Sequence, residues 1–176
     1  MAASRSIDLS SVPAWEPLQV FNLTPIVTGK GLPTLQELNL TWADILRPVL
    51  PRRKSRGSMS EFQRRFSECR WRQRINCSYA EQCYNYLWSL GAQACGVPPA
   101  SQWSRFCESG SVAWDGESVD GRYRATDCRS CAEGGVWVLY NCVLNGNVDG
   151  TTVWYEGTQE SVSDPHIVIH VRPSGW

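Results

Sequence analysis

The sequence has few lysines, histidines and methionines, and it contains no long hydrophobic run. Of its 176 residues, two are lysine, two histidine and two methionine. The sequence has only short apolar runs, such as residues 136–140, far below the roughly 20 residues of a membrane-spanning helix. This excludes a helical membrane span. The first 30 residues include Arg5, Asp8 and Glu16 and have no continuous apolar core, so we expect no secretory signal there.

The charges balance, because 17 basic residues face 17 acidic ones. This excludes a chain that is cationic or anionic throughout. Fifteen of the 17 basic residues are arginine, a side chain that favours bidentate contacts with carboxylate or phosphate and stacking on aromatic rings. With 42% hydrophobic and 19% charged residues, the composition is that of a folded protein.

Residues 1–57 are rich in proline and lack sustained periodicity. Six prolines interrupt them, and proline fixes φ and removes a hydrogen-bond donor. We therefore predict an extended arm with at most a short helical piece, from Leu35 to Leu46, where Leu38 and Trp42 would share an apolar stripe. Such an arm wraps its own domain, or it contacts a protein partner or a second copy of the chain.

Residues 58–108 have helical signals. Capping-box patterns at residues 58–61 and 78–81 predict one helix from Met59 to Arg74 and a second that ends near Gly91. A short turn is predicted around residues 103–107.

Residues 109–176 have the turn signals and alternating patterns of β-strands. Val136–Leu144 is predicted as a central strand, Thr151–Tyr155 as its antiparallel partner and Ile167–Val171 as the last of about five strands. The expected fold class is α+β: an extended N-terminal arm, a short helical segment, then an antiparallel β-sheet forming a small sandwich or barrel. Residues 58–176 are expected to form one compact domain.

The charges are segregated along the chain. Residues 47–74 hold ten basic and two acidic residues, a net of +8, whereas residues 108–176 hold four basic and ten acidic ones, a net of −6. The basic stretch predicts binding to nucleic acid or to an acidic partner, because arginines neutralise phosphates while aromatic rings stack. Alternatively, these basic residues form a solvated helix face, pair with the acidic segment or contact a membrane surface. The predicted binding residues are Arg52, Arg53, Lys54, Arg56, Arg64, Arg65, Arg70, Trp71, Arg72 and Arg74.

Eight cysteines allow three interpretations. They are reduced and buried, or they form four disulfides in an oxidising compartment, or some of them hold a structural zinc ion. Three Asn-x-Ser/Thr sequons and the stretch at residues 53–56, which resembles a processing site, favour secretion, whereas the missing signal favours the cytoplasm. The expected zinc ligands are Cys107, Cys128, Cys131 and Cys142.

Catalytic signals are sparse. His166 and His170 would lie about 13 Å apart along a strand, too far for one metal ion. A cysteine–histidine hydrolase using His166 and Asp164 is a minor alternative. Trp137 and Trp154 fall on the two strands predicted to pair, where they form an exposed aromatic platform or pack in the core.

Two functions fit these observations. The first is a non-enzymatic structural or binding protein of the cytoplasm or a virion, such as a virus-encoded nucleoprotein or assembly component, whose basic segment contacts nucleic acid or an acidic partner. The second is a secreted, disulfide-stabilised β-domain effector or lectin-like binding protein. For the structural or binding protein, we expect no cofactor other than a structural zinc ion.

Overall fold

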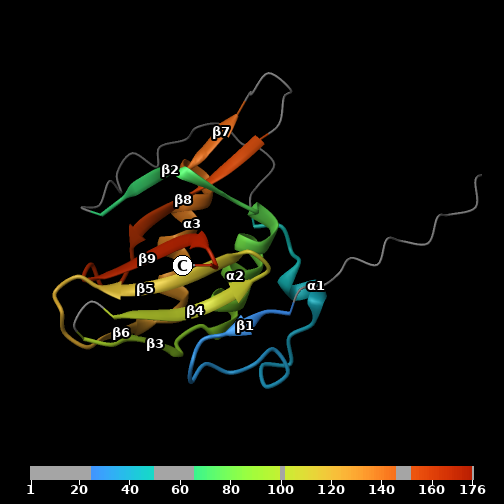
Figure 1. The fold of residues 1–176 in the computed structure, drawn as a ribbon. Helices are drawn as coiled ribbons and strands as arrows, with labels where there is room; N and C mark the ends of the chain where they lie inside the picture. The colour runs from blue at the N-terminus through green and yellow to red at the C-terminus, as the bar shows by residue number, and fades with distance from the viewer. Residues whose placement is uncertain (1–24, 50–65, 100–101, 146–151, 176) are drawn as a thin grey trace, which may run out of the picture.

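The computed structural model describes residues 25–49, 66–99, 102–145 and 152–175 (Figure 1). Within these residues, seven strands form one antiparallel sheet. Its order is β1-β4-β5-β9-β8-β2, and β7 pairs with β8 beside β9. The strands are β1 (Val27–Thr28), β2 (Glu68–Ile75), β4 (Trp103–Ser109), β5 (Val112–Ser118), β7 (Val143–Asn145), β8 (Thr152–Glu160) and β9 (Ile167–Pro173).

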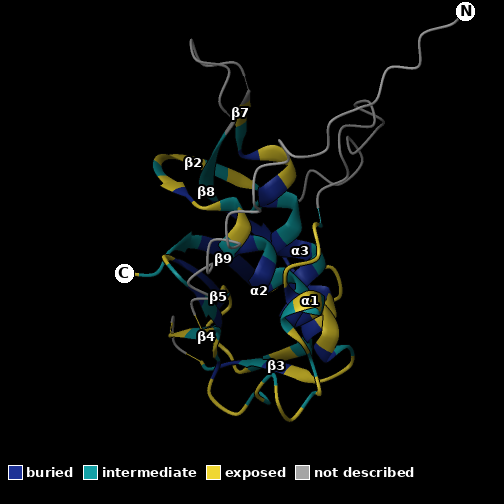
Figure 2. Cartoon of the chain, turned by 90° about the vertical axis from the view of Figure 1, so that its right-hand side faces the viewer, coloured by how far each residue is buried: buried dark blue, intermediate teal, exposed yellow. Residues whose placement is uncertain are grey.

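The helices cover one face of this sheet. Helices α2 (Cys77–Leu90) and α3 (Cys128–Asn141) form a layer behind it, and the short helix α1 (Trp42–Ile45) packs on α2 (Figures 1 and 2). Strands β3 (Ala94–Val97) and β6 (Arg124–Asp127) form a separate two-stranded sheet. The α+β class is confirmed, but the sheet is open rather than a barrel or sandwich, because helices supply the second layer. None of the described helices has the length and hydrophobicity needed to cross a membrane.

Helix α2 is the predicted helix that ends near Gly91. The side chain of Asn76, rather than that of Ser78, caps its start by accepting a hydrogen bond from the Tyr79 backbone N–H at 3.3 Å. Gly91 ends the helix with a φ of 58°, a backbone conformation that glycine adopts without strain.

Helix α3 replaces the strand predicted at Val136–Leu144. Asp127 caps this helix, its carboxylate accepting a hydrogen bond from the Ser130 backbone N–H at 2.8 Å. Gly134 and Gly135, a pair of a kind that often marks a turn, are buried within α3, where the absence of side chains lets the helix approach the sheet. Only β7, three residues long, remains of the strand, and it pairs with β8 in the predicted antiparallel manner.

Strand β2 replaces the described part of the helix predicted over Met59–Arg74. It pairs with β8 at one edge of the sheet, so tertiary pairing overrides the local helical signals of this segment. The turn expected at residues 103–107 lies within strand β4. The helix expected over Leu35–Leu46 is reduced to the four residues of α1, whose buried residue is Ile45.

Residues 25–49 lie against the rest of the chain. The Tyr86 hydroxyl donates to the Pro33 carbonyl at 2.7 Å, and the Asn85 amide donates to the carbonyls of Ile45 and Arg47 at 2.8 and 2.7 Å. Strand β1 also pairs with β4. The described part of the arm thus wraps its own domain.

Three disulfides tie the helix layer to strands. Their Cα–Cα distances are 5.2, 5.6 and 5.0 Å, within the usual range for such bonds. The interpretation in which the cysteines are mostly reduced is therefore wrong. The disulfide interpretation is correct for three of its four expected bridges, because Cys77 and Cys131 are free thiols. The pairs are Cys69–Cys142, Cys83–Cys107 and Cys95–Cys128.

Candidate functional site

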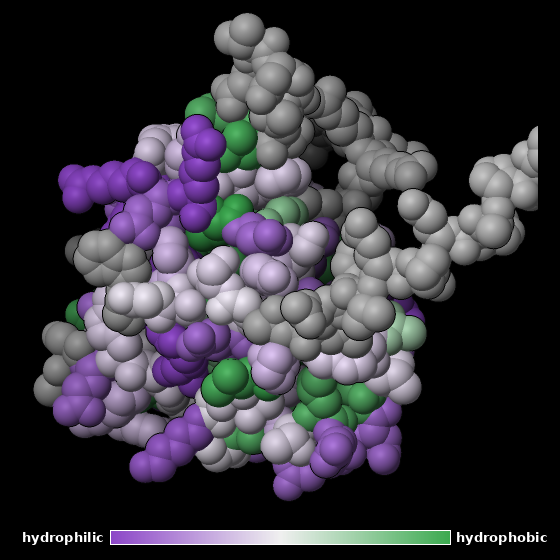
Figure 3. Space-filling model, turned by 45° about the vertical axis from the view of Figure 1, so that its right-hand side comes forward, coloured by the Kyte–Doolittle hydropathy of each residue, from purple (hydrophilic) through white to green (hydrophobic). Residues whose placement is uncertain are grey.

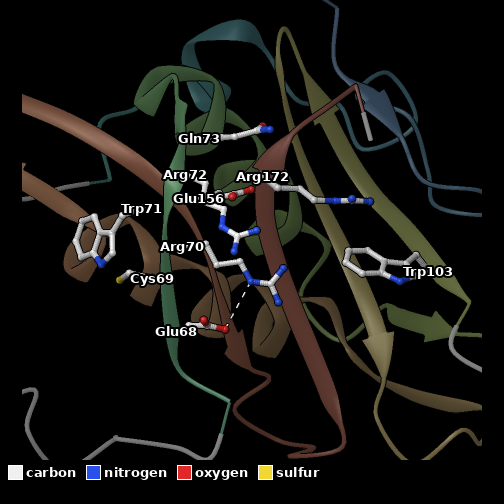
Figure 4. A pocket seen from close by; sticks show the side chains of 9 residues that line it. All are labelled: Glu68, Cys69, Arg70, Trp71, Arg72, Gln73, Trp103, Glu156 and Arg172. Atoms are coloured by element: carbon white, nitrogen blue, oxygen red, sulfur yellow. Dashed lines mark ion pairs between the residues drawn. The ribbon is translucent and has the colours of Figure 1, made fainter.

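The sheet face opposite the helices has many charged side chains. In the strand register Arg70 pairs with Glu156, and Asp115 pairs with His170. Cross-strand partners project from the same face of a sheet, so strands distant in sequence bring these groups together. Hydrophilic side chains gather over much of the visible surface, and hydrophobic ones form separate patches (Figure 3). A cleft of about 650 Å³ lies here, lined by residues of β2, β4, β8 and β9 (Figure 4).

A buried carboxylate holds Arg172 at one wall of the cleft. Asp115 is 1% exposed; its carboxylate accepts from Arg172 Nε at 2.7 Å and from Arg105 Nε at 2.9 Å. The Arg172 guanidinium carbon also lies 4.1 Å from the ring centroid of Trp103, a cation–π contact. Asp115 and Trp103 together fix the direction of Arg172.

His170 lies beneath Trp103, with their ring centroids 4.1 Å apart. Burial, and then the positive charges of Arg70 and Arg172, lower the pKa of His170 to about 3, so the imidazole is neutral. His170 Nε2 lies 2.9 Å from a Glu117 carboxylate oxygen. Since a carboxylate only accepts hydrogen bonds, Nε2 carries the proton. A neutral, buried imidazole of this kind positions Trp103 rather than acting as a general base near neutral pH.

The opposite wall is formed by β2 and carries two arginines. Arg70 Nε lies 3.6 Å from a Glu68 carboxylate oxygen, and both side chains are about half exposed, so this ion pair contributes little free energy. Arg72 has no ion pair or hydrogen bond to any described residue. Burial raises the pKa of Glu156, while Arg70, Arg172 and Arg72 partly offset that effect. Three arginines and two glutamates thus line the cleft, and Arg172 is the arginine that already has a buried carboxylate partner, Asp115.

A bulge in β2 determines which side chains reach the cleft. Arg70 pairs with Glu156, but the next pair joins Arg74 to Tyr155, so residues 71–73 have no partners across the ladder. Such a bulge redirects side chains. Arg72 extends toward the cleft, whereas Trp71 points to the other side of β2 (Figure 4) and packs edge-on against Tyr155, with ring centroids 5.3 Å apart.

The structure brings together some of the predicted binding residues. Arg70, Trp71 and Arg72 are among the residues that line the cleft, although the Trp71 ring points to the other side of β2 (Figure 4). Arg74 is exposed at the far side of the bulge. The prediction did not find Arg172 and Trp103, because neither has a local signal and only the strand register places them opposite β2. The other predicted residues, Arg52, Arg53, Lys54, Arg56, Arg64 and Arg65, lie outside the described residues.

The predicted zinc ligands are not assembled. Cys107, Cys128 and Cys142 each form a disulfide with a different cysteine, which removes the thiolates that zinc needs, and only Cys131 is free. Burial raises the pKa of Cys131, and it raises that of Cys77 to about 12. Both free thiols are therefore protonated, the state opposite to that of a nucleophilic thiolate.

The predicted aromatic platform is also not formed. Trp137 lies on α3 and Trp154 on β8, and both pack against the hydrophobic core. Trp154 Nε1 donates to the Leu139 carbonyl at 3.2 Å. The two rings thus belong to the packing between α3 and the sheet, which was the alternative interpretation.

Fold and cleft together define a disulfide-stabilised α+β protein with an open sheet and an arginine-lined cleft. A model of the family described as Domain of unknown function (DUF8794) matches residues 65–169, and the chain belongs to this family. The match includes the cleft residues on β2, β4 and β8 and ends before Arg172. No curated protein and no solved structure matches the chain.

Proposed function

We propose that this protein is a non-enzymatic binding protein that takes up an anionic ligand in the cleft between β2 and β4. The observation that carries the proposal is the convergence of Arg70, Arg72 and Arg172 on one solvent-facing site. Arg172 is held by Asp115 through Nε, and Arg72 forms no ion pair within 4 Å with a described residue. Arginine presents several N–H groups in a plane, so an incoming carboxylate, sulfate or phosphate can be bound by two of them at once.

The three disulfides favour a secreted or extracellular location for this protein. Three bridges are typical of secreted and extracellular proteins and rare in the cytosol. The sequons and the basic stretch at residues 53–56 point in the same direction. We therefore favour a secreted binding protein over the cytoplasmic or virion component.

A titration with a sulfated oligosaccharide, a heparin hexasaccharide, tests the proposal. Replacing Arg70 and Arg72 by alanine should weaken binding about tenfold per arginine, since each charged hydrogen bond contributes about 1.5 kcal/mol. Arg122→Ala is the matched control, because this arginine is exposed and is not among the residues that line the cleft. Equal affinities of the wild type and the double variant would refute the proposal.

Nucleic acid is the second candidate ligand. The observation that favours it is the continuity of the cleft arginines on β2 with the basic stretch before them, which together carry ten basic residues over residues 47–74. A single-stranded 12-nucleotide probe tests it. Tighter binding to this probe than to the hexasaccharide, lost on replacing Arg52, Arg53 and Arg56, would establish this candidate. A contribution of residues 1–57 to self-assembly also stays a prediction.

A further inference from the structure

We infer that the ligand of this cleft is an acidic sugar, a uronate unit of an oligosaccharide, whose carboxylate binds Arg70 and Arg72 and whose hydroxyl groups bind Glu156. The inference rests on the proposed function, because it names the ligand of the same cleft. It joins three features of the site: its size, the carboxylate at its centre and the exposed indole at its wall.

The size of the cleft suits a small ligand or one part of a chain. Its volume of about 650 Å³ lies within the range of roughly 300–1,000 Å³ in which proteins bind small molecules. The cleft is open along the sheet, so an oligosaccharide can extend beyond the unit that it binds. The β2 edge and the Trp103 side chain mark its two sides (Figure 4).

The arginines fit a carboxylate. Arg72 forms no hydrogen bond and no ion pair within 4 Å with a described residue, and the one ion pair of Arg70 with a described residue is the exposed pair with Glu68, at 3.6 Å. The planar fork of a guanidinium matches the two oxygens of a carboxylate. A ligand carboxylate can therefore replace Glu68 as the partner of Arg70 at small cost, because an exposed ion pair contributes little.

Glu156 distinguishes an acidic sugar from a denser polyanion. It pairs in register with Arg70 and sits among three arginines, yet no ion pair within 4 Å joins it to any described residue. A carboxylate at this place repels each sulfate or phosphate of a closely charged chain. To a sugar hydroxyl it is instead a strong acceptor. A ligand that carries one negative group and several hydroxyl donors satisfies both sides of the site.

Trp103 supplies an apolar surface beside these polar groups. The residue is 40% exposed, and its ring is held by the Arg172 guanidinium and the His170 imidazole, each centred 4.1 Å away. A rigid indole offers contact area without a large entropic cost. The C–H groups of a pyranose ring are the part of a sugar that packs on such a surface.

The test compares three probes of defined charge on the full chain: a galacturonate trimer, the neutral galactose trimer and a heparin hexasaccharide. We expect the uronate trimer to bind at least tenfold more tightly than the neutral one. Glu156→Gln should weaken uronate binding about fivefold, because it replaces a charged hydrogen-bond acceptor for the sugar hydroxyls by a weaker neutral one. It should tighten heparin binding, because it removes a repulsive charge. The decisive result is that Glu156→Gln lowers the affinity for the uronate trimer and raises the affinity for heparin.

Aromatic variants provide the matched controls. Trp103→Ala should weaken uronate binding about tenfold, and Trp103→Phe should restore part of it. Trp88→Ala should leave it unchanged, because this ring is similarly exposed, at 38%, but lies on α2, in the helix layer on the other face of the sheet. Unfolding midpoints of all variants, compared with the wild type, verify that each is folded.

Three results would overturn the inference. Tighter binding of both anions by Glu156→Gln would make Glu156 a mere counter-ion, and equal affinities for the two trimers would make the charge of the sugar irrelevant. Loss of uronate binding in Trp88→Ala would place the ligand elsewhere. In each case, heparin binding that depends on Arg70 and Arg72 would still support the proposed anion-binding function. If neither anion binds, both the inference and the proposed function are wrong.

Discussion

Replacing Gly135 by alanine tests whether α3 lies as close to the sheet as the structure shows. Gly135 lies within α3, over Trp114 of β5. A Cβ atom added there would fall 2.7 and 2.8 Å from two atoms of the Trp114 ring and closer still to a third. Trp114 is fully buried, so the ring has no free space into which it can move.

Two opposing effects determine the free energy. Alanine in place of glycine within a helix stabilises by about 1 kcal/mol. Overpacking a close-packed core costs about 1–3 kcal/mol, and a clash with a rigid, buried ring lies at the upper end of that range. The expected net change is a loss of about 2 kcal/mol in the free energy of unfolding, or about 4–8 °C in the melting temperature for a chain of this size.

Urea unfolding followed by tryptophan fluorescence measures this loss as a lower midpoint with an unchanged slope. Gly175→Ala makes the same chemical change where no atom lies within 4 Å of the added Cβ, and it should be neutral. If Gly135→Ala is as stable as the wild type or more so, the close approach of α3 to Trp114 is wrong.

Three further predictions concern the bridges and the polar sheet face. Reduction should add about six daltons to the intact mass, two per bridge, and removing Cys69–Cys142, which spans 73 residues, should cost about 4 kcal/mol in urea unfolding; a mass unchanged by reductant would contradict the bridges. Asp115→Asn should cost about 2 kcal/mol in the same assay, less than for a fully buried pair because its arginine partners are 20–30% exposed; a neutral effect would contradict its role. The folded-state pKa of His170, about 3, lies below the ordinary 6.5, so its contribution to stability is present above pH 6.5 and is lost as the pH falls toward 3. His170→Gln should flatten that part of the stability–pH curve, and an unchanged curve would contradict the burial of this imidazole.

The elements that the sequence predicts correctly are those whose signals are local. Helix α2 has a capping residue at one end and Gly91 at the other, and the alternation at Ile167–Val171 matches strand β9. The helix α3 was missed because residues 136–144 are apolar at nearly every position, a pattern that fits a buried strand and a buried helix equally. The pair Gly134–Gly135 then favoured a turn, whereas these glycines serve close packing that only the tertiary structure reveals. The cap of Asp127 on Ser130 was the available signal.

The residues of the candidate site likewise divide into those with a local signal in the sequence and those that only the strand pairing brings in. Arg70 and Arg72 were predicted as binding residues from the basic composition of their segment, although on a helix instead of a strand. Arg172 and Trp103 lie about 100 and 30 residues further along the chain. The pairing of β2 with β8, β8 with β9, β9 with β5 and β5 with β4 brings them to the same face. The charge segregation in the sequence left open whether the basic and acidic segments bind separate partners or pair with each other. In the structure, basic and acidic residues of different segments share this sheet face.

The most direct test of the central claim is the affinity of the folded, oxidised protein for the heparin hexasaccharide at two salt concentrations, measured for the wild type, Arg70→Ala with Arg72→Ala, and Arg122→Ala. The account predicts that the wild type and Arg122→Ala bind alike and weaken as salt rises. It also predicts that the double variant binds at least tenfold more weakly at low salt and depends less on salt. Equal binding by all three proteins would contradict an anion-binding cleft between β2 and β4.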